Sequence, residues 1–100
     1  MEAEFDIADV ATCFEYYGGL ANKVTGQVNP VPDNAISLTL KEPVGVAGQI
    51  IPWNYPLLQA GWKVAPALLA GNTIILKPSE LTPSTSILLM QALEEAGLPA

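Results

Sequence analysis

The stretch IIPWNYPLLQAGWKVAPALLAGNTIILKPSE, residues 50–80, decides the fold of this chain. Within it, an apolar segment is bounded by Pro56 on one side and Gly71 on the other. Proline is common in the first turn of a helix and glycine just beyond the last. We therefore expect a helix from about residue 56 to about residue 69, bent or shortened at Pro66 because proline lacks a backbone donor.

The segments on either side of this helix are predicted strands. Residues 44–51 form a nearly continuous apolar run, which is typical of a strand buried on both faces of a parallel sheet. Residues 73–76 form a second, β-branched run. Thr82, with Pro83 behind it, predicts the N-cap of a further helix that closes at Gly97. Two right-handed βα units in succession indicate a doubly wound α/β fold.

The N-terminal part is predicted to be a helix followed by a loop and a strand. Apolar residues in residues 6–25 recur in steps of three and four, which favours a helix that ends at Gly26. Gly18 and Gly19 weaken that helix by about 1 kcal/mol each relative to alanine. Residues 29–34 read as a loop, and alternating apolar residues over 36–40 predict a half-exposed strand.

We expect three parts: an N-terminal helical segment (1–28), a loop with a bridging strand (29–42), and the first βα units of a nucleotide-binding domain (43–100). Two parallel strands leave both edges and one face of a sheet open. The sequence stops where a third parallel strand is expected, so we expect a truncated domain. Cooperative melting of the isolated chain as a monomer would contradict this hypothesis.

Composition excludes several classes of function. The 100 residues carry a net charge of −6, which argues against nucleic-acid binding and against a basic membrane-surface patch. No apolar run approaches the roughly 18 residues of a membrane span. The acidic residues 1–4 are the opposite of a signal peptide's first region, and we take the protein to be cytoplasmic. There is no histidine and one cysteine, so we expect no metal site and no internal disulfide.

The turn after the first predicted strand lacks the glycines of a dinucleotide-binding loop. G-x-G-x-x-G is usual there, and Pro52-Trp53-Asn54-Tyr55-Pro56 stands in its place. Ligands of open α/β sheets nevertheless collect at the carboxyl ends of the strands. Asn54 or Tyr55 can cap the next helix. Asn54 has a second, compatible interpretation as a preorganised hydrogen-bond donor to an oxyanion. Trp53 is most simply a packing residue.

The second predicted strand ends in Lys77-Pro78-Ser79-Glu80. An acidic residue at this place commonly binds ribose hydroxyls, and Lys77 can donate to the same sugar. The same four residues are also an ordinary loop composition, so spacing alone leaves both interpretations open. Lys63 is most simply a solvated helix lysine. Cys13 is expected to pack in a helix, because no basic neighbour lowers the pKa of its thiol.

Six segments carry a family resemblance: residues 42–46, 52–57, 62–68, 70–73, 77–83 and 95–99. Together they resemble the NAD-dependent aldehyde dehydrogenase superfamily, and most closely its betaine-aldehyde or ω-aminoaldehyde branch. The resemblance implies an atypical Rossmann domain that binds NAD(P)⁺ without the glycine-rich turn. It implies that Ile51, Pro52 and Trp53 line the cofactor cleft.

The same resemblance assigns roles to the second loop. Lys77 and Glu80 would hold the adenosine ribose, with Pro78 and Ser79 shaping the loop. A carboxylate at Glu80 would repel a 2′-phosphate, so the expected cofactor is NAD rather than NADP. Asn54 would polarise the carbonyl of a small-molecule aldehyde as an oxyanion donor. Lys63 matches a lysine to which a charge-relay role is assigned in the betaine-aldehyde branch.

The expected reaction is oxidation of an aldehyde to a carboxylic acid with NAD⁺ through a cysteine thiohemiacetal. The family's nucleophilic cysteine and general-base glutamate lie outside this chain, and Cys13 does not match the nucleophile, so we expect the isolated chain to be inactive. The strand over 36–40 resembles the family's bridging element, which implies a homo-oligomer, a dimer or a tetramer. Two alternatives stay open: a nucleotide-binding module, and a non-catalytic interaction piece.

Overall fold

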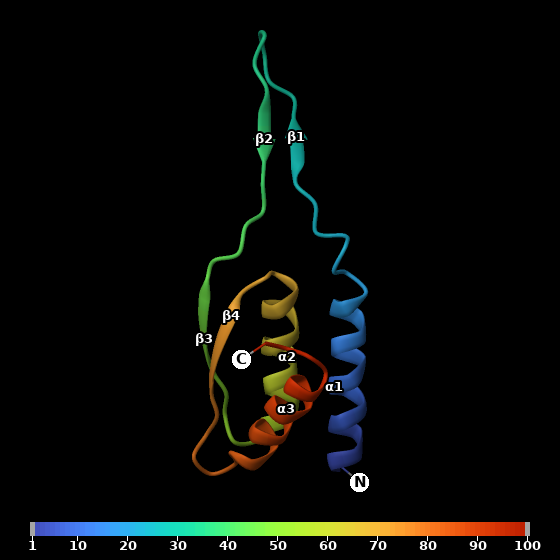
Figure 1. Ribbon diagram of the computed structural model, residues 1–100, viewed down its shortest axis with the longest axis vertical. Coiled ribbons are helices and arrows are strands. Elements are labelled where there is room, and N and C mark those ends of the chain that lie inside the picture. The colour runs from blue at the N-terminus through green and yellow to red at the C-terminus, as the bar shows by residue number, and fades with distance from the viewer. Residues whose placement is uncertain (1, 100) are drawn as a thin grey trace.

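The computed structural model describes residues 2–99. Met1 and Ala100, the ends of the first and last expected parts, lie outside the described residues. The elements are α1 (Glu2–Gly18), β1 (Gln27–Asn29), β2 (Ser37–Thr39), β3 (Val46–Ile50), α2 (Pro56–Leu69), β4 (Thr73–Lys77) and α3 (Ser84–Glu95). The molecule measures 60 × 26 × 23 Å, because the hairpin of β1 and β2 projects from the body along the long axis (Figure 1).

Helix α2 has the predicted bounds. It begins at Pro56 and ends at Leu69. Gly71 follows in the left-handed conformation, with a φ of +75°. The amides of Gly71 and Asn72 donate to carbonyls of the last helical turn at 2.9 and 3.1 Å, which is the Schellman arrangement. Gly97, with a φ of +95°, closes α3 in the same way.

Strands β3 and β4 pair in parallel, in register from Val46 with Thr73 to Ile50 with Lys77. Their side chains alternate between a half-buried face on the α2 side and an exposed face. Val46, Ile50 and Ile75 on the exposed face keep 67%, 72% and 65% of their surface accessible. The prediction that the first strand is buried on both faces is therefore wrong for this chain, since the described helices cover one face.

The core lies where α1 and α2 meet, and it includes Ile51 just beyond the end of β3. The sheet, α2 and α1 form successive layers (Figure 1). The buried apolar side chains are Val10, Ile51, Ala60, Val64 and Ala65. A Cβ atom at Gly61 would lie 3.1 Å from the Val10 methyl groups, so the missing side chain lets α1 approach α2 closely.

Two expectations for the N-terminal part need correction. Helix α1 ends at Gly18, not at Gly26, because Gly18 and Gly19 lose more conformational freedom in a helix than other residues do. Strand β1, at Gln27–Asn29, was not predicted, since three residues with one apolar side chain show no alternation. It pairs antiparallel with β2, which is shorter than the strand expected over residues 36–40.

The start of α3 also differs from the prediction. Pro83 is the N-cap residue, with helical φ and ψ angles, and no side chain caps the helix. The Thr82 hydroxyl is buried without a partner among the described residues. Because the helix starts one position later than expected, Thr82 is not the cap. No helix in residues 2–99 is long and apolar enough to cross a membrane.

Candidate functional site

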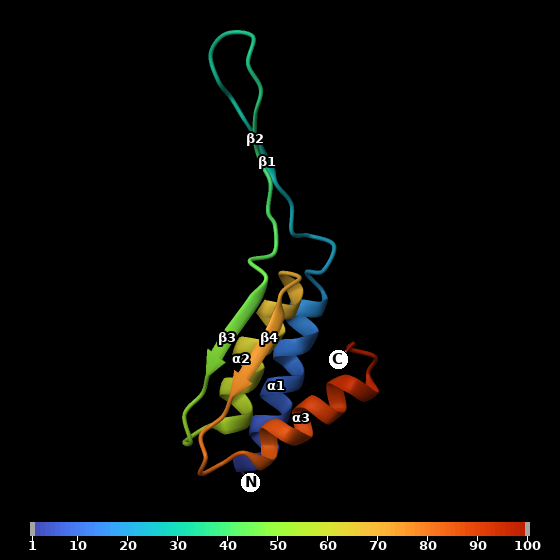
Figure 2. The same ribbon diagram turned by 60° about the vertical axis from the view of Figure 1, so that its left-hand side comes forward.

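The two strand ends that carry the predicted site residues lie side by side. Because β3 and β4 are parallel, the turn over residues 51–55 and the loop over residues 78–83 both leave the sheet at the end opposite the hairpin (Figure 2). The Ile51 amide donates to the Lys77 carbonyl at 3.1 Å, which extends the parallel ladder by one bond. The structure therefore brings the two predicted site segments together at the carboxyl ends of the strands.

The turn after β3 is anchored at one residue and exposed beyond it. Ile51 is buried, with 2% of its surface accessible. Pro52, Trp53, Asn54 and Tyr55 are exposed, and Trp53 keeps 61% of its surface accessible. The expectation that Trp53 packs in the interior is therefore wrong within residues 2–99. An exposed indole beside the end of a strand is available to line a cleft.

Asn54 does not cap α2. The N-cap residue is Tyr55, with φ −140° and ψ 67°, and no side chain bonds to the first helical amides. Among the described residues, no partner for the Asn54 carboxamide is found. The cap interpretation is thus wrong for Asn54, and both N–H donors of its side chain remain available to a ligand.

The loop after β4 is shaped by Ser79. The Ser79 hydroxyl accepts a hydrogen bond from the Leu81 amide at 3.3 Å, and the Ser79 carbonyl accepts one from the Thr82 amide at 3.2 Å. These bonds form a turn that Pro78 enters with a fixed φ angle. The loop conformation is therefore held locally, as expected of Pro78 and Ser79.

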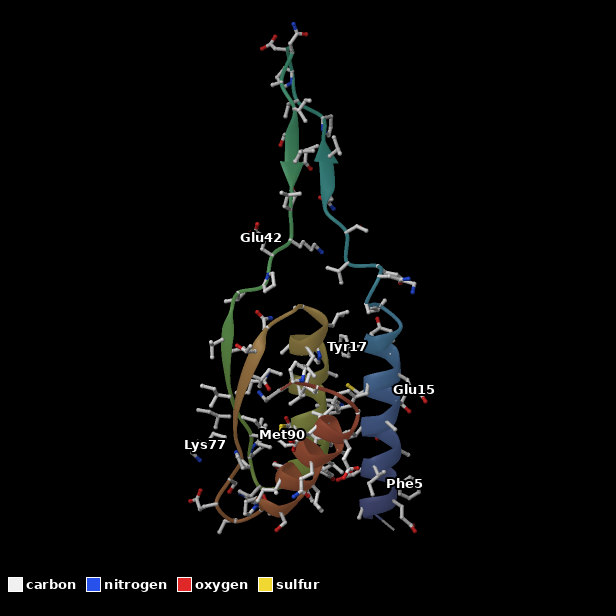
Figure 3. The ribbon with its side chains drawn as sticks, viewed as in Figure 1. Phe5, Glu15, Tyr17, Glu42, Lys77 and Met90 are labelled. Carbon is white, nitrogen blue, oxygen red and sulfur yellow. The ribbon has the colours of Figure 1, made fainter. Side chains whose placement is uncertain are left out.

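Lys77 and Glu80 present opposite charges from this loop. Both side chains are exposed. Figure 3 shows Lys77 pointing away from the helices, and its ammonium donates to the Pro78 carbonyl at 3.1 Å. An ammonium and a carboxylate in one loop supply both a donor and acceptors, and this pair fits the hydroxyl groups of a ribose.

Lys63 lies apart from the turn. It is half-buried on α2, roughly 10 Å along the helix axis from Pro56 at 1.5 Å per residue. The structure therefore does not place it beside Asn54. Its carbonyl oxygen accepts a hydrogen bond from the Gln49 side chain at 2.9 Å. Sequence reasoning missed Gln49, although a lone polar side chain in an apolar strand is a recognisable signal.

Cys13 is remote from the site. It is half-buried on α1, and its thiol donates to the Gly61 carbonyl at 3.6 Å. Burial raises the pKa of the Cys13 thiol above its ordinary value, which lowers the fraction of reactive thiolate. The structure thus agrees with the prediction that Cys13 serves in packing.

The helix side of the sheet contains an apolar cavity of about 610 Å³ between α2, β4 and α3. Val64, Ile74 and Met90 are among its lining residues. None of the predicted cofactor or catalytic residues lines it. The cavity and the candidate site are therefore separate features of the chain.

Comparison with known families accounts for this arrangement. Residues 1–100 match the aldehyde dehydrogenase family over their whole length. The chain belongs to the aldehyde dehydrogenase family. The family resemblance drawn from the sequence is thereby confirmed.

This aldehyde dehydrogenase chain is 56% identical over 100 residues to betaine aldehyde dehydrogenase of Bacillus subtilis, covering 98% of this chain and 20% of that protein. It is 48% identical to apo betaine aldehyde dehydrogenase of Staphylococcus aureus, with a TM-score of 0.93 over 98% of this chain and 20% of that one. An NAD⁺ complex of aldehyde dehydrogenase from Bacillus cereus is 44% identical, with a TM-score of 0.89 over 94% and 19%.

These likenesses confirm the α/β fold class and its match to part of a larger nucleotide-binding domain. The chain spans about a fifth of the length of these relatives. The aldehyde dehydrogenase in that NAD⁺ complex contains a region whose fold is closely similar to this chain.

Proposed function

We propose that the whole protein oxidises an aldehyde to a carboxylic acid with NAD⁺. The observation that carries the proposal is the pairing of two loops at the carboxyl ends of β3 and β4, joined by the bond from the Ile51 amide to the Lys77 carbonyl. One loop offers the free carboxamide of Asn54, and the other offers the charges of Lys77 and Glu80.

The cofactor is proposed to lie across both loops. Ile51, Pro52 and Trp53 would line its cleft, and Lys77 and Glu80 would hydrogen-bond the adenosine ribose. Pro78 and Ser79 would shape the loop, and the hydrogen bond that the Ser79 hydroxyl accepts from the Leu81 amide supports this role. NAD⁺, when bound, accepts the hydride that leaves the aldehyde carbon. NAD is preferred to NADP because the Glu80 carboxylate repels a 2′-phosphate.

Asn54 is proposed to act on the aldehyde oxygen. A cysteine thiolate from outside this chain adds to the carbonyl carbon, and the oxygen gains negative charge. The Asn54 side chain and a backbone N–H donate hydrogen bonds to that oxygen, which lowers the barrier to thiohemiacetal formation. After hydride transfer, a water activated by a glutamate outside this chain hydrolyses the thioester. Lys63 would relay charge from its place on α2.

Replacing Asn54 by alanine in the full-length protein tests this role. We expect kcat to fall by about 10²- to 10³-fold, the usual effect of removing one oxyanion donor, while the Kd for NAD⁺ stays unchanged. Steady-state kinetics and cofactor titration measure the two quantities. Asn22→Ala removes an exposed asparagine far from the site and is the matched control. Equal turnover in Asn54→Ala and wild type would remove the catalytic role.

The remaining assignments concern the whole protein. The names of two relatives favour a betaine-aldehyde substrate. The hairpin of β1 and β2 exposes Val28, Ile36 and Leu38 to 76%, 82% and 59%, which supports a homo-oligomer, dimer or tetramer, formed through residues 29–42.

Residues 1–28 and 43–100 are the other two proposed parts, and the cytoplasm is the proposed compartment.

A further inference from the structure

Gln49 is a polar side chain on the otherwise apolar face of β3 and β4 that α2 covers. Its neighbours on that face are Ala47, Ile74 and Leu76. The Gln49 side-chain nitrogen donates to the Lys63 carbonyl oxygen at 2.9 Å. Its side-chain oxygen is buried and has no partner among the described residues. An apolar side chain would avoid that unmet acceptor, so the unpaired oxygen of Gln49 carries a cost in stability.

The bond from Gln49 meets α2 at a weakened turn. Pro66 lies inside the helix and has no N–H, so the Trp62 carbonyl loses its intrahelical partner. The Gln49 side chain donates to the next carbonyl along, that of Lys63. The hydrogen bond from β3 therefore supports the helical turn that Pro66 weakens.

The same bond closes the segment that contains Asn54. Gln49 and Lys63 are 14 residues apart, and the turn over residues 51–55 lies between them. At the strand end, the Ile51 amide is fixed to the Lys77 carbonyl. Since the Asn54 side chain has no partner of its own in residues 2–99, its position depends on how the end of β3 and helix α2 are set against each other.

We infer that Gln49 is a positioning residue for the oxyanion donor: its amide fixes α2 on β3 and thereby fixes the backbone that presents Asn54. The inference rests on the proposed function. Misplacement of a catalytic group by about 1 Å can lower a rate by about 10²-fold. Loss of the hydrogen bond from Gln49 is therefore expected to slow the reaction of the aldehyde.

Gln49→Met in the full-length protein keeps the length of the side chain and removes the donor. We expect kcat to fall by about 10- to 100-fold with the Kd for NAD⁺ unchanged. In an Asn54→Ala background the same change should have no further effect on kcat, because Gln49 acts through Asn54. Gln91→Met, at an exposed position on α3, is the matched control.

Two results would overturn the inference. Gln49→Met either leaves kcat unchanged, or lowers it equally in the wild-type and Asn54→Ala backgrounds, as a merely structural role would. Unchanged turnover in Asn54→Ala alone is a different result, since it removes the proposed role of Asn54 itself.

Gln49→Glu provides a second test if Gln49→Met does not fold. A protonated glutamic acid donates to the Lys63 carbonyl, and a carboxylate cannot. The protonated form prevails below the pKa of the new side chain, so the ratio of variant to wild-type kcat should rise as pH falls. A ratio that stays constant with pH would also overturn the inference.

Discussion

Glu80 is an exposed acidic residue in the loop that follows β4. The Lys77 ammonium in the same loop is held by the Pro78 carbonyl at 3.1 Å. In the proposed complex, a ribose between these groups would meet both charges. A phosphate on that ribose would meet the Glu80 carboxylate as a like charge and would be repelled by it.

Glu80→Gln should therefore relax the choice between the two cofactors. We expect the kcat/KM ratio of NADP to NAD to rise about tenfold, which corresponds to about 1.4 kcal/mol. Kinetics of the full-length variant with each cofactor measure it. Glu94→Gln, an exposed glutamate at the end of α3, is the control. The same ratio in Glu80→Gln and wild type would contradict a ribose role for this carboxylate.

At this scale the sequence predicts some site residues and misses others for a physical reason. The roles expected for Asn54 and Glu80 come from a family resemblance carried by contiguous motifs. The role of Ser79 in its loop is visible in local hydrogen bonds. The Gln49 bond reaches across the sheet to α2, and no local pattern specifies which carbonyl it meets.

The helix ends are where the sequence is most informative about the elements. Pro56, Gly71 and Gly97 act through their own backbone preferences, so the limits of α2 and the end of α3 were predictable. The exposure of one face of β3 depends on whether another layer covers it, and β1 forms because it pairs with β2. Neither follows from the residues of the strand itself. Composition alone cannot tell whether a neighbouring layer covers a strand, and Val46 illustrates this with 67% of its surface accessible.

The two closing glycines differ in one respect that mutation can measure. Both have positive φ, so alanine at either costs about 1–2 kcal/mol. At Gly71 a Cβ would also lie 3.0 Å from the Pro43 ring, whereas Gly97 has open space. We expect Gly71→Ala to lower the thermal midpoint of the full-length protein by more degrees than Gly97→Ala. Calorimetry showing equal shifts would argue against the Pro43 contact.

The whole molecule buries little of its apolar surface. Its radius of gyration is 17.1 Å, against about 13 Å for a compact domain of this length. One face of the sheet is open, with Ile50 and Ile75 at 72% and 65% accessible. Burial of such a face supplies much of the stability of a parallel sheet.

We therefore expect the isolated 100-residue chain to unfold without a cooperative transition and without stabilisation by NAD⁺. Circular dichroism during heating, with and without millimolar NAD⁺, measures both. The full-length protein under the same conditions is the control. A sharp transition of a monomer, or a midpoint that rises with NAD⁺, would show that these residues form an autonomous nucleotide-binding module.

The bond from the Ile51 amide to the Lys77 carbonyl also bears on which sequence changes this site tolerates. It fixes the spacing of two loops that leave adjacent strands in register. An insertion or deletion in either loop would displace the side chains of that loop relative to those of the other, while the register of β3 and β4 stays the same. Cofactor choice in descendants of this sequence is thus expected to change by replacement of side chains, with both loop lengths preserved.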